Sequence, residues 1–181
     1  GFAGLGANGI IRKVLTEQMT LHKDIRQQID DFKAKYWPEK VIGVHIRYTD
    51  RKTNLAKYEK HLERFLRRYP EAHIFLATDN RQVNNEYRER FRNVFSTPKW
   101  FPEIMTSMHQ NMNCPDKIAN GIEALVDMYL LAECDCLIYS GYSTFSLISH
   151  ILSDAQPENI IDIDRFNIKV RSKKLIRELL A

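Results

Sequence analysis

Residues 41–46 read Val-Ile-Gly-Val-His-Ile, a nearly continuous apolar run that is rich in β-branched side chains. Such a run is typical of a parallel strand that is buried on both faces. A second apolar run occupies residues 73–77, after a helical pattern at 54–69, and two more lie at 135–139 and 160–163. Strands that alternate with helices form βαβ units. The sequence therefore predicts an α/β fold with a parallel sheet covered by helices on both faces.

Apolar residues at helical spacing predict the remaining elements. They predict a long helical lead-in that ends before Pro38, three internal helices and a helix from Ser172 onward, at residues 8–36, 81–93, 118–133, 143–152 and 172–181. Residues 97–117 hold three prolines and no periodicity, which predicts a long loop of the kind that is usually functional or mobile. We expect a leader and helical lead-in at 1–38 and one Rossmann-like domain at 39–181.

Composition narrows the class of protein. The 181 residues are 44% hydrophobic and 28% charged, with a net charge of +4, which is ordinary for one folded, water-soluble domain. Basic residues on the helix at 54–69 alternate with Glu59 and Glu63, so a solvated face is favoured over a nucleic-acid-binding stripe. No transmembrane segment or signal peptide is expected. Three cysteines fit a reducing compartment, Cys134 and Cys136 are expected to be small buried side chains, and no metal site is predicted.

The first candidate site follows the strand at 41–46. Ligands of open parallel sheets bind beyond the carboxyl ends of strands. His45 and Arg47 are two residues apart and so lie on one face of the strand. A buried guanidinium needs an anion, and its planar shape suits a phosphate. The alternative is a structural ion pair of Arg47 with Asp50 or Asp79, with His45 bonded to the backbone.

Two more candidate sites lie further along the chain. Residues 140–144, Ser-Gly-Tyr-Ser-Thr, form a turn that opens a helix, where free backbone N–H groups and the helix dipole favour a phosphate. Alternatively, Ser143 is simply the N-cap of that helix. Asp127 lies on an apolar helix and could accept hydrogen bonds from a base or ribose, although a lone helix aspartate is more often solvated.

These three places, in this order, resemble the α1,6-fucosyltransferases, including the bacterial nodulation type, and their protein O-fucosyltransferase relatives. The strand at 41–46 continues into His45-x-Arg47-x-x-Asp50, which looks like the first motif of the family. Residues 75–79 are similar to the second motif, and the spacing from Asp127 to Ser143 also matches. The resemblance covers residues 10–150.

The resemblance implies an activity. The chain would be the nucleotide-binding half of a GT-B glycosyltransferase, which binds GDP-fucose and transfers fucose to a glycan acceptor with inversion, without a metal or other cofactor. Arg47 would bind the β-phosphate and act as the catalytic residue by stabilising charge on the departing GDP. Ser143 and Thr144, with their turn, would assist at the diphosphate.

The resemblance also assigns roles around these groups. His45 and Asp127 would contact the guanine end, Asp50 would orient the loop around Arg47, and Asp79 would shape the neighbouring strand end. The acceptor-side half is expected outside these 181 residues, since this length makes one Rossmann-like domain. The expected compartment is the bacterial cytoplasm, or the Golgi or ER lumen for a part of a eukaryotic enzyme.

The sequence departs from the family pattern at two positions. Tyr48 replaces a second arginine of the mammalian-type enzymes, and Leu55 replaces a glutamate thought to activate the acceptor; the next carboxylate is Glu59. The catalytic base and the acceptor are therefore not identified. Two other functions stay open: a GDP-binding module without catalytic power, and a phosphosugar-binding isomerase or regulator domain, which would not need Asp127.

Overall fold

The computed structural model describes residues 2–49, 53–102 and 114–166. Five strands form one sheet in the order β3-β2-β1-β4-β5, and every neighbouring pair is parallel. This is the strand order of a doubly wound sheet, which has its switch point between β1 and β4. The predicted α/β fold is confirmed. The strands are β1 (Val41–Ile46), β2 (His73–Thr78), β3 (Val94–Phe95), β4 (Cys136–Tyr139) and β5 (Ile160–Asp162).

Strand β1 is the centre of the sheet. All six of its residues are buried, and it pairs with β2 on one side and with β4 on the other. Gly43 leaves room for the end of α5 (Lys117–Ala132) and the residues after it, because a Cβ at this position would lie 3.3 Å from Leu131 and 2.8 Å from the Sγ of Cys134. Cys134 is a buried free thiol, and burial raises its pKa well above the usual value. The expectation that Cys134 and Cys136 are small buried side chains is confirmed, and Cys114 is buried as well.

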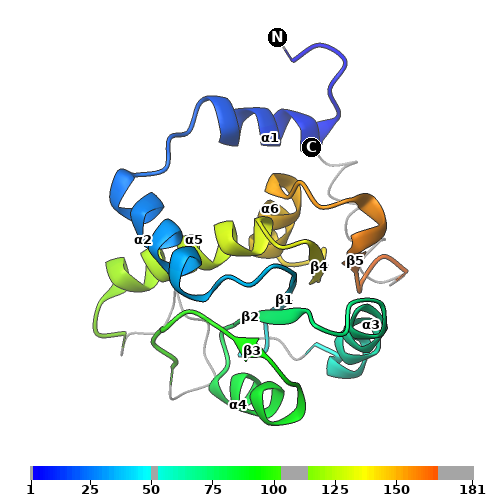
Figure 1. Cartoon of the computed structure of the whole chain (residues 1–181). Helices are drawn as coiled ribbons and strands as arrows, with labels where there is room; N and C mark the ends of the chain where they lie inside the picture. Colours follow the sequence, from blue (N-terminus) through cyan, green and yellow to red (C-terminus); the bar gives the residue numbers. More distant parts are fainter. Residues whose placement is uncertain (1, 50–52, 103–113, 167–181) are drawn as a thin grey trace.

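Helices cover both faces of the sheet, as Figure 1 shows. On one face, Tyr58 and Leu62 of α3 and Tyr87 of α4 pack into one apolar cluster. On the other face, Ile29 of α2 and Leu130 of α5 belong to a second cluster. A short 3₁₀ helix, Pro157–Asn159, leads into β5. The remaining helices are α1 (Ala7–Glu17), α2 (Lys23–Tyr36), α3 (Leu55–Arg68), α4 (Arg81–Arg90) and α6 (Thr144–Leu152).

The expected single helix at residues 8–36 is wrong, because the chain forms α1 and α2 with a break between them. The two helices have different partners: α1 packs on α6, whereas α2 packs on α5. Arg12 of α1 donates to the carbonyls of Ile151 and Ser153 at 2.8 and 3.0 Å. These carbonyls lie at the end of α6, where they have no partner within the helix. His22 caps α2 by accepting from the N–H of Asp24. The chain must therefore change direction between α1 and α2, because the two helices pack against different parts of the domain.

The loop expected at 97–117 is partly described. Residues 97–102 and 114–116 contain no helix or strand, and 103–113 lie outside the described residues, as does the helix expected from Ser172. Strand β3 was not expected, because two residues are too short for a periodicity. The division of the chain at residue 38 stays a prediction.

Candidate functional site

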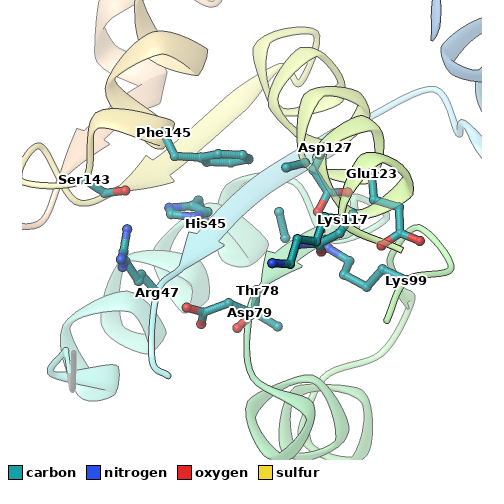
Figure 2. A pocket seen from close by; sticks show the side chains of 14 residues that line it. His45, Arg47, Thr78, Asp79, Lys99, Lys117, Glu123, Asp127, Ser143 and Phe145 are labelled. Atoms are coloured by element: carbon teal, nitrogen blue, oxygen red, sulfur yellow. Dashed lines mark hydrogen bonds and ion pairs between the residues drawn. The ribbon is translucent and has the colours of Figure 1, made fainter. Parts of the chain in front are cut away.

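A cavity of about 440 Å³ lies at the carboxyl ends of β1 and β2, beside α5 and the start of α6 (Figure 2). This volume is within the usual range for sites that hold small molecules. Five residues predicted for the site line it: His45, Arg47, Asp79, Asp127 and Ser143. The other lining residues are Ala77, Thr78, Lys99, Lys117, Asn120, Gly121, Glu123, Ala124 and Phe145.

Arg47 and Ser143 lie together at one end of this cavity (Figure 2). Arg47 directly follows β1, and Ser143 directly precedes α6. The Ser143 side chain is buried but makes no capping hydrogen bond, and its Oγ has no hydrogen-bond partner among the described residues. Ser143 therefore occupies the N-cap position of α6, as the simpler interpretation expected, but its side chain does not cap the helix. A buried hydroxyl without a partner, beside a guanidinium and a helix N-terminus, suits an anionic ligand.

The turn at 140–143 is fixed by hydrogen bonds to Asp162 at the end of β5 and to Asp164 just after it. Asp162 accepts from the N–H of Gly141 at 2.8 Å, and Ser140 donates to the carboxylate of Asp164. A Cβ at Gly141 would collide with the Asp162 carboxylate, so a larger residue there would displace this hydrogen-bond acceptor. The N–H of Ser143 is also engaged, since it donates to the carbonyl of Ser140 at 3.0 Å. The ligand-facing donors of this turn are thus the N–H groups of the first turn of α6.

His45 lies between the two ends of the cavity and stacks on Phe145, with ring centroids 4.7 Å apart (Figure 2). Its side chain is buried, and Nδ1 has no hydrogen-bond partner among the described residues. Burial and, to a smaller extent, the nearby cations Lys99 and Arg47 together lower the pKa of His45 to about 3. The ring is therefore neutral at physiological pH, and it can present an unpaired nitrogen to a ligand.

This shifted pKa predicts a loss of stability in acid. Because the folded pKa of about 3 lies below the ordinary 6.5, the unfolded chain binds a proton at His45 between these values and the folded chain does not. The free energy of unfolding should therefore fall as the pH is lowered through this range, by about 1.4 kcal/mol per pH unit from His45. Urea unfolding of the parent and His45→Phe at about pH 7.5 and about pH 5 measures this contribution. An equal pH dependence in both proteins would contradict it.

Asp79 holds the segment that follows Arg47. It accepts from the N–H groups of Tyr48 at 2.8 Å and Thr49 at 3.2 Å, and the Thr49 hydroxyl donates to its carbonyl at 2.8 Å. Burial raises the pKa of the Asp79 carboxyl, and these hydrogen bonds and Arg47 oppose that shift. The contacts fit the predicted shaping of a strand end. Asp50, the other acid predicted here, lies outside the described residues.

Asp127 is buried at the opposite end of the cavity from Arg47 (Figure 2). Thr97 donates to its Oδ1 at 2.6 Å, and Lys99 donates to its Oδ2. The side chains of Lys99 and Asp127 are only 5% and 7% exposed. The solvated-helix interpretation of Asp127 is therefore wrong, and its role at a guanine base stays a prediction.

The sequence did not predict most of the residues that line the end of the cavity near Asp127. Lys99 lies in the loop for which only a general functional role was expected. Lys117, Asn120, Gly121 and Ala124 have the spacing of one helical face, a signal that could have marked α5 as a cavity wall. The Oδ1 of Asn120 is buried without a partner among the described residues. Thr144, predicted for the site, is exposed and is not among the lining residues.

Glu59, the next carboxylate after Leu55 in the sequence, is not among the residues that line the cavity. It lies on α3 and pairs with Arg90 of α4 at 2.7 Å. Among the residues that the structure describes, no three His, Cys, Asp or Glu side chains gather as a metal site would need. No helix in the same part of the chain is long and apolar enough to cross a membrane.

A parallel sheet of this order, with a polar cavity beyond its central strands, defines a Rossmann-like ligand-binding domain. The sequence profile of Nodulation protein Z (NodZ) matches residues 8–172, so the chain belongs to the Nodulation protein Z family. The predicted resemblance to nodulation-type fucosyltransferases is thereby confirmed.

Individual relatives agree with the profile. Nodulation protein Z of Azorhizobium caulinodans is 29% identical over 171 residues, which cover 82% of this chain and 48% of the relative. That of Bradyrhizobium diazoefficiens is 30% identical over 133 residues, which cover 64% and 35%. The chain thus spans at most about half the length of the curated relatives that it matches.

Solved structures show the same similarity. A NodZ α-1,6-fucosyltransferase soaked with GDP-fucose is 28% identical, with a TM-score of 0.57, over 83% of this chain and 47% of that one. A NodZ α-1,6-fucosyltransferase co-crystallized with GDP is also 28% identical, with a TM-score of 0.55, over 74% and 43%.

Proposed function

We propose that this chain is the donor-binding part of a fucosyltransferase, which binds GDP-fucose and transfers fucose to a glycan acceptor. The observation that carries the proposal is the end of the cavity where Arg47, the unpartnered Ser143 hydroxyl and the start of α6 meet. The similarity to NodZ α-1,6-fucosyltransferase structures with GDP-fucose and GDP supports the choice of donor.

In this proposal the diphosphate lies at the Arg47 end. The guanidinium takes the β-phosphate with charge-assisted hydrogen bonds, and N–H groups of α6 and the Ser143 hydroxyl take the remaining oxygens. As the bond to fucose breaks, negative charge grows on the departing GDP, and these fixed donors stabilise it. They supply the positive charge that a metal supplies in other transferases, so we propose a metal-independent transfer with inversion.

A catalytically inactive GDP-binding module is the second candidate. The observation in its favour is that each carboxylate lining the cavity, Asp79, Asp127 and Glu123, already accepts a hydrogen bond from the protein. In an active enzyme, any of these three that activated the acceptor would have to do so while keeping or giving up such a contact. An assay of fucose transfer from GDP-fucose to a glycan acceptor by the full-length protein separates the two candidates.

A thermal-shift panel tests the proposed donor. GDP at about 100 times its dissociation constant should add about 2.7 kcal/mol to the free energy of unfolding. UDP and fucose 1-phosphate at the same concentration should add much less, because each lacks the guanine contacts, and fucose 1-phosphate also lacks the diphosphate. EDTA should not change the GDP shift. Stabilisation by fucose 1-phosphate alone would favour a phosphosugar-binding domain, and loss of the shift with EDTA would contradict the metal-independent proposal.

A further inference from the structure

The cavity has a second polar end, formed by Lys99 and Asp127. Figure 2 shows both side chains across the cavity from Arg47 and Ser143, with His45 and Phe145 between the two ends. If the diphosphate occupies the Arg47 end, as proposed above, the base of the nucleotide must extend toward this second end. Lys99 and Asp127 then lie at the end of the cavity that the base would reach, with Lys117 and Glu123 on the same side.

The Lys99–Asp127 pair is unusual in being almost completely buried. The two side chains are 5% and 7% exposed. A buried ion pair is weak evidence for a role in stability, because well-packed apolar residues of similar size are often as stable or more stable. The pair also leaves hydrogen-bonding capacity unused. An ammonium has three N–H groups, and the one acceptor found for Lys99 among the described residues is Asp127.

Asp127 retains capacity of the same kind. A carboxylate offers about four acceptor positions, and Thr97 and Lys99 occupy two of them. The pair therefore presents a donor directly beside an acceptor at the wall of a cavity. Guanine carries the complementary pattern on one edge, since its O6 accepts while the adjacent N1–H and N2–H donate. Adenine carries the opposite pattern there, with an N6–H donor beside an N1 acceptor.

We propose that Lys99 is a specificity-determining residue, which donates a hydrogen bond to O6 of the base while Asp127 accepts from N1–H and N2–H. The inference rests on the proposed function and extends it, because it makes the choice of guanine over adenine depend on a cation as well as on an acid. The pairing of Lys with guanine O6 is common in nucleic-acid recognition, so the geometry has a chemical precedent.

Calorimetric titration with three nucleotides tests this role. GDP, ADP and the diphosphate of 2-aminopurine riboside differ at the group that Lys99 would contact, since 2-aminopurine keeps the N2 amino group but lacks O6. Its N1 also carries no hydrogen, so its binding is compared between parent and variant and not directly with that of GDP. Lys99→Met should weaken GDP by roughly 10- to 150-fold, the range for a hydrogen bond to a charged group. Binding of the 2-aminopurine nucleotide should change by less than about threefold, and the preference for GDP over ADP should shrink by about tenfold or more.

Two further variants test whether the change in nucleotide affinity is specific to the removal of the Lys99 ammonium. Lys33→Met removes a lysine that also pairs with a carboxylate, Glu133, but does not line the cavity, and it should leave all three affinities unchanged. Lys99→Gln keeps an uncharged N–H donor and should retain part of the preference for GDP. If Lys99→Met does not fold, Lys99→Gln carries the same comparison, because ratios between nucleotides within one folded variant do not depend on its stability.

The outcomes separate this inference from the function on which it rests. If the parent binds GDP tightly and Lys99→Met weakens all three nucleotides equally, or none of them, the inference is wrong and the donor site stands. If the parent binds GDP no better than ADP or the 2-aminopurine nucleotide, the inference is also wrong. If the parent binds none of the three, the proposed function and the inference fail together.

Discussion

Arg47→Ala is expected to weaken GDP binding by roughly 10- to 150-fold, because it removes charge-assisted hydrogen bonds of about 1.5–3 kcal/mol to the β-phosphate. GMP lacks that phosphate, so its affinity should change much less. Calorimetric titration of both nucleotides measures the difference. Arg90→Ala is a suitable control, since Arg90 pairs with Glu59 and Glu63 away from the cavity.

If Arg47 contacts the β-phosphate, Arg47→Ala must weaken the binding of GDP much more than the binding of GMP. Equal losses for GDP and GMP would indicate that Arg47 shapes the pocket without contacting the β-phosphate. Unchanged GDP binding by a folded Arg47→Ala protein would favour the structural ion pair that the sequence left open. Circular dichroism of each variant shows whether the fold is retained.

Asp127→Ala is expected to lower the free energy of unfolding by about 3–5 kcal/mol, because it leaves the Lys99 ammonium buried without a counter-charge. The double variant Asp127→Leu/Lys99→Met should recover most of this loss, since replacing both partners with apolar groups leaves no buried charge. Urea unfolding of the parent and the single and double variants measures the coupling.

A second ion pair provides the control for this prediction. Glu133 pairs with Lys33, and their side chains are 31% and 34% exposed. Glu133→Ala should therefore cost no more than about 1 kcal/mol, as is usual for exposed pairs. If Asp127→Ala costs as little as Glu133→Ala, the Lys99–Asp127 pair is hydrated in solution, and the argument for a dedicated donor–acceptor pair loses its basis.

The fold could be predicted from the sequence because burial and periodicity act locally. The apolar run at 41–46 identified β1, since a strand with helices on both faces must be apolar at successive positions. The break between α1 and α2 could not be predicted in the same way. It depends on contacts of Arg12 with the end of α6, which is about 140 residues away in the sequence.

The candidate site was predictable where its residues follow strands. His45, Arg47 and Asp79 lie at or just beyond strand ends, and topology alone brings such positions to one edge of a sheet. Lys99 was not predictable, because its loop has no periodicity and its partner Asp127 lies 28 residues away. The burial of Asp127 was missed for the same reason, as the sequence does not show which cation would compensate it.

A crystal structure of the protein with GDP tests the central claim most directly. We expect the diphosphate against Arg47 and the first turn of α6, with the Ser143 hydroxyl donating to a phosphate oxygen. The guanine should lie beyond His45 and Phe145, within hydrogen-bonding distance of Asp127. GDP bound outside this cavity, or bound in it with the base at Arg47 and the phosphates at Lys99, would contradict the account.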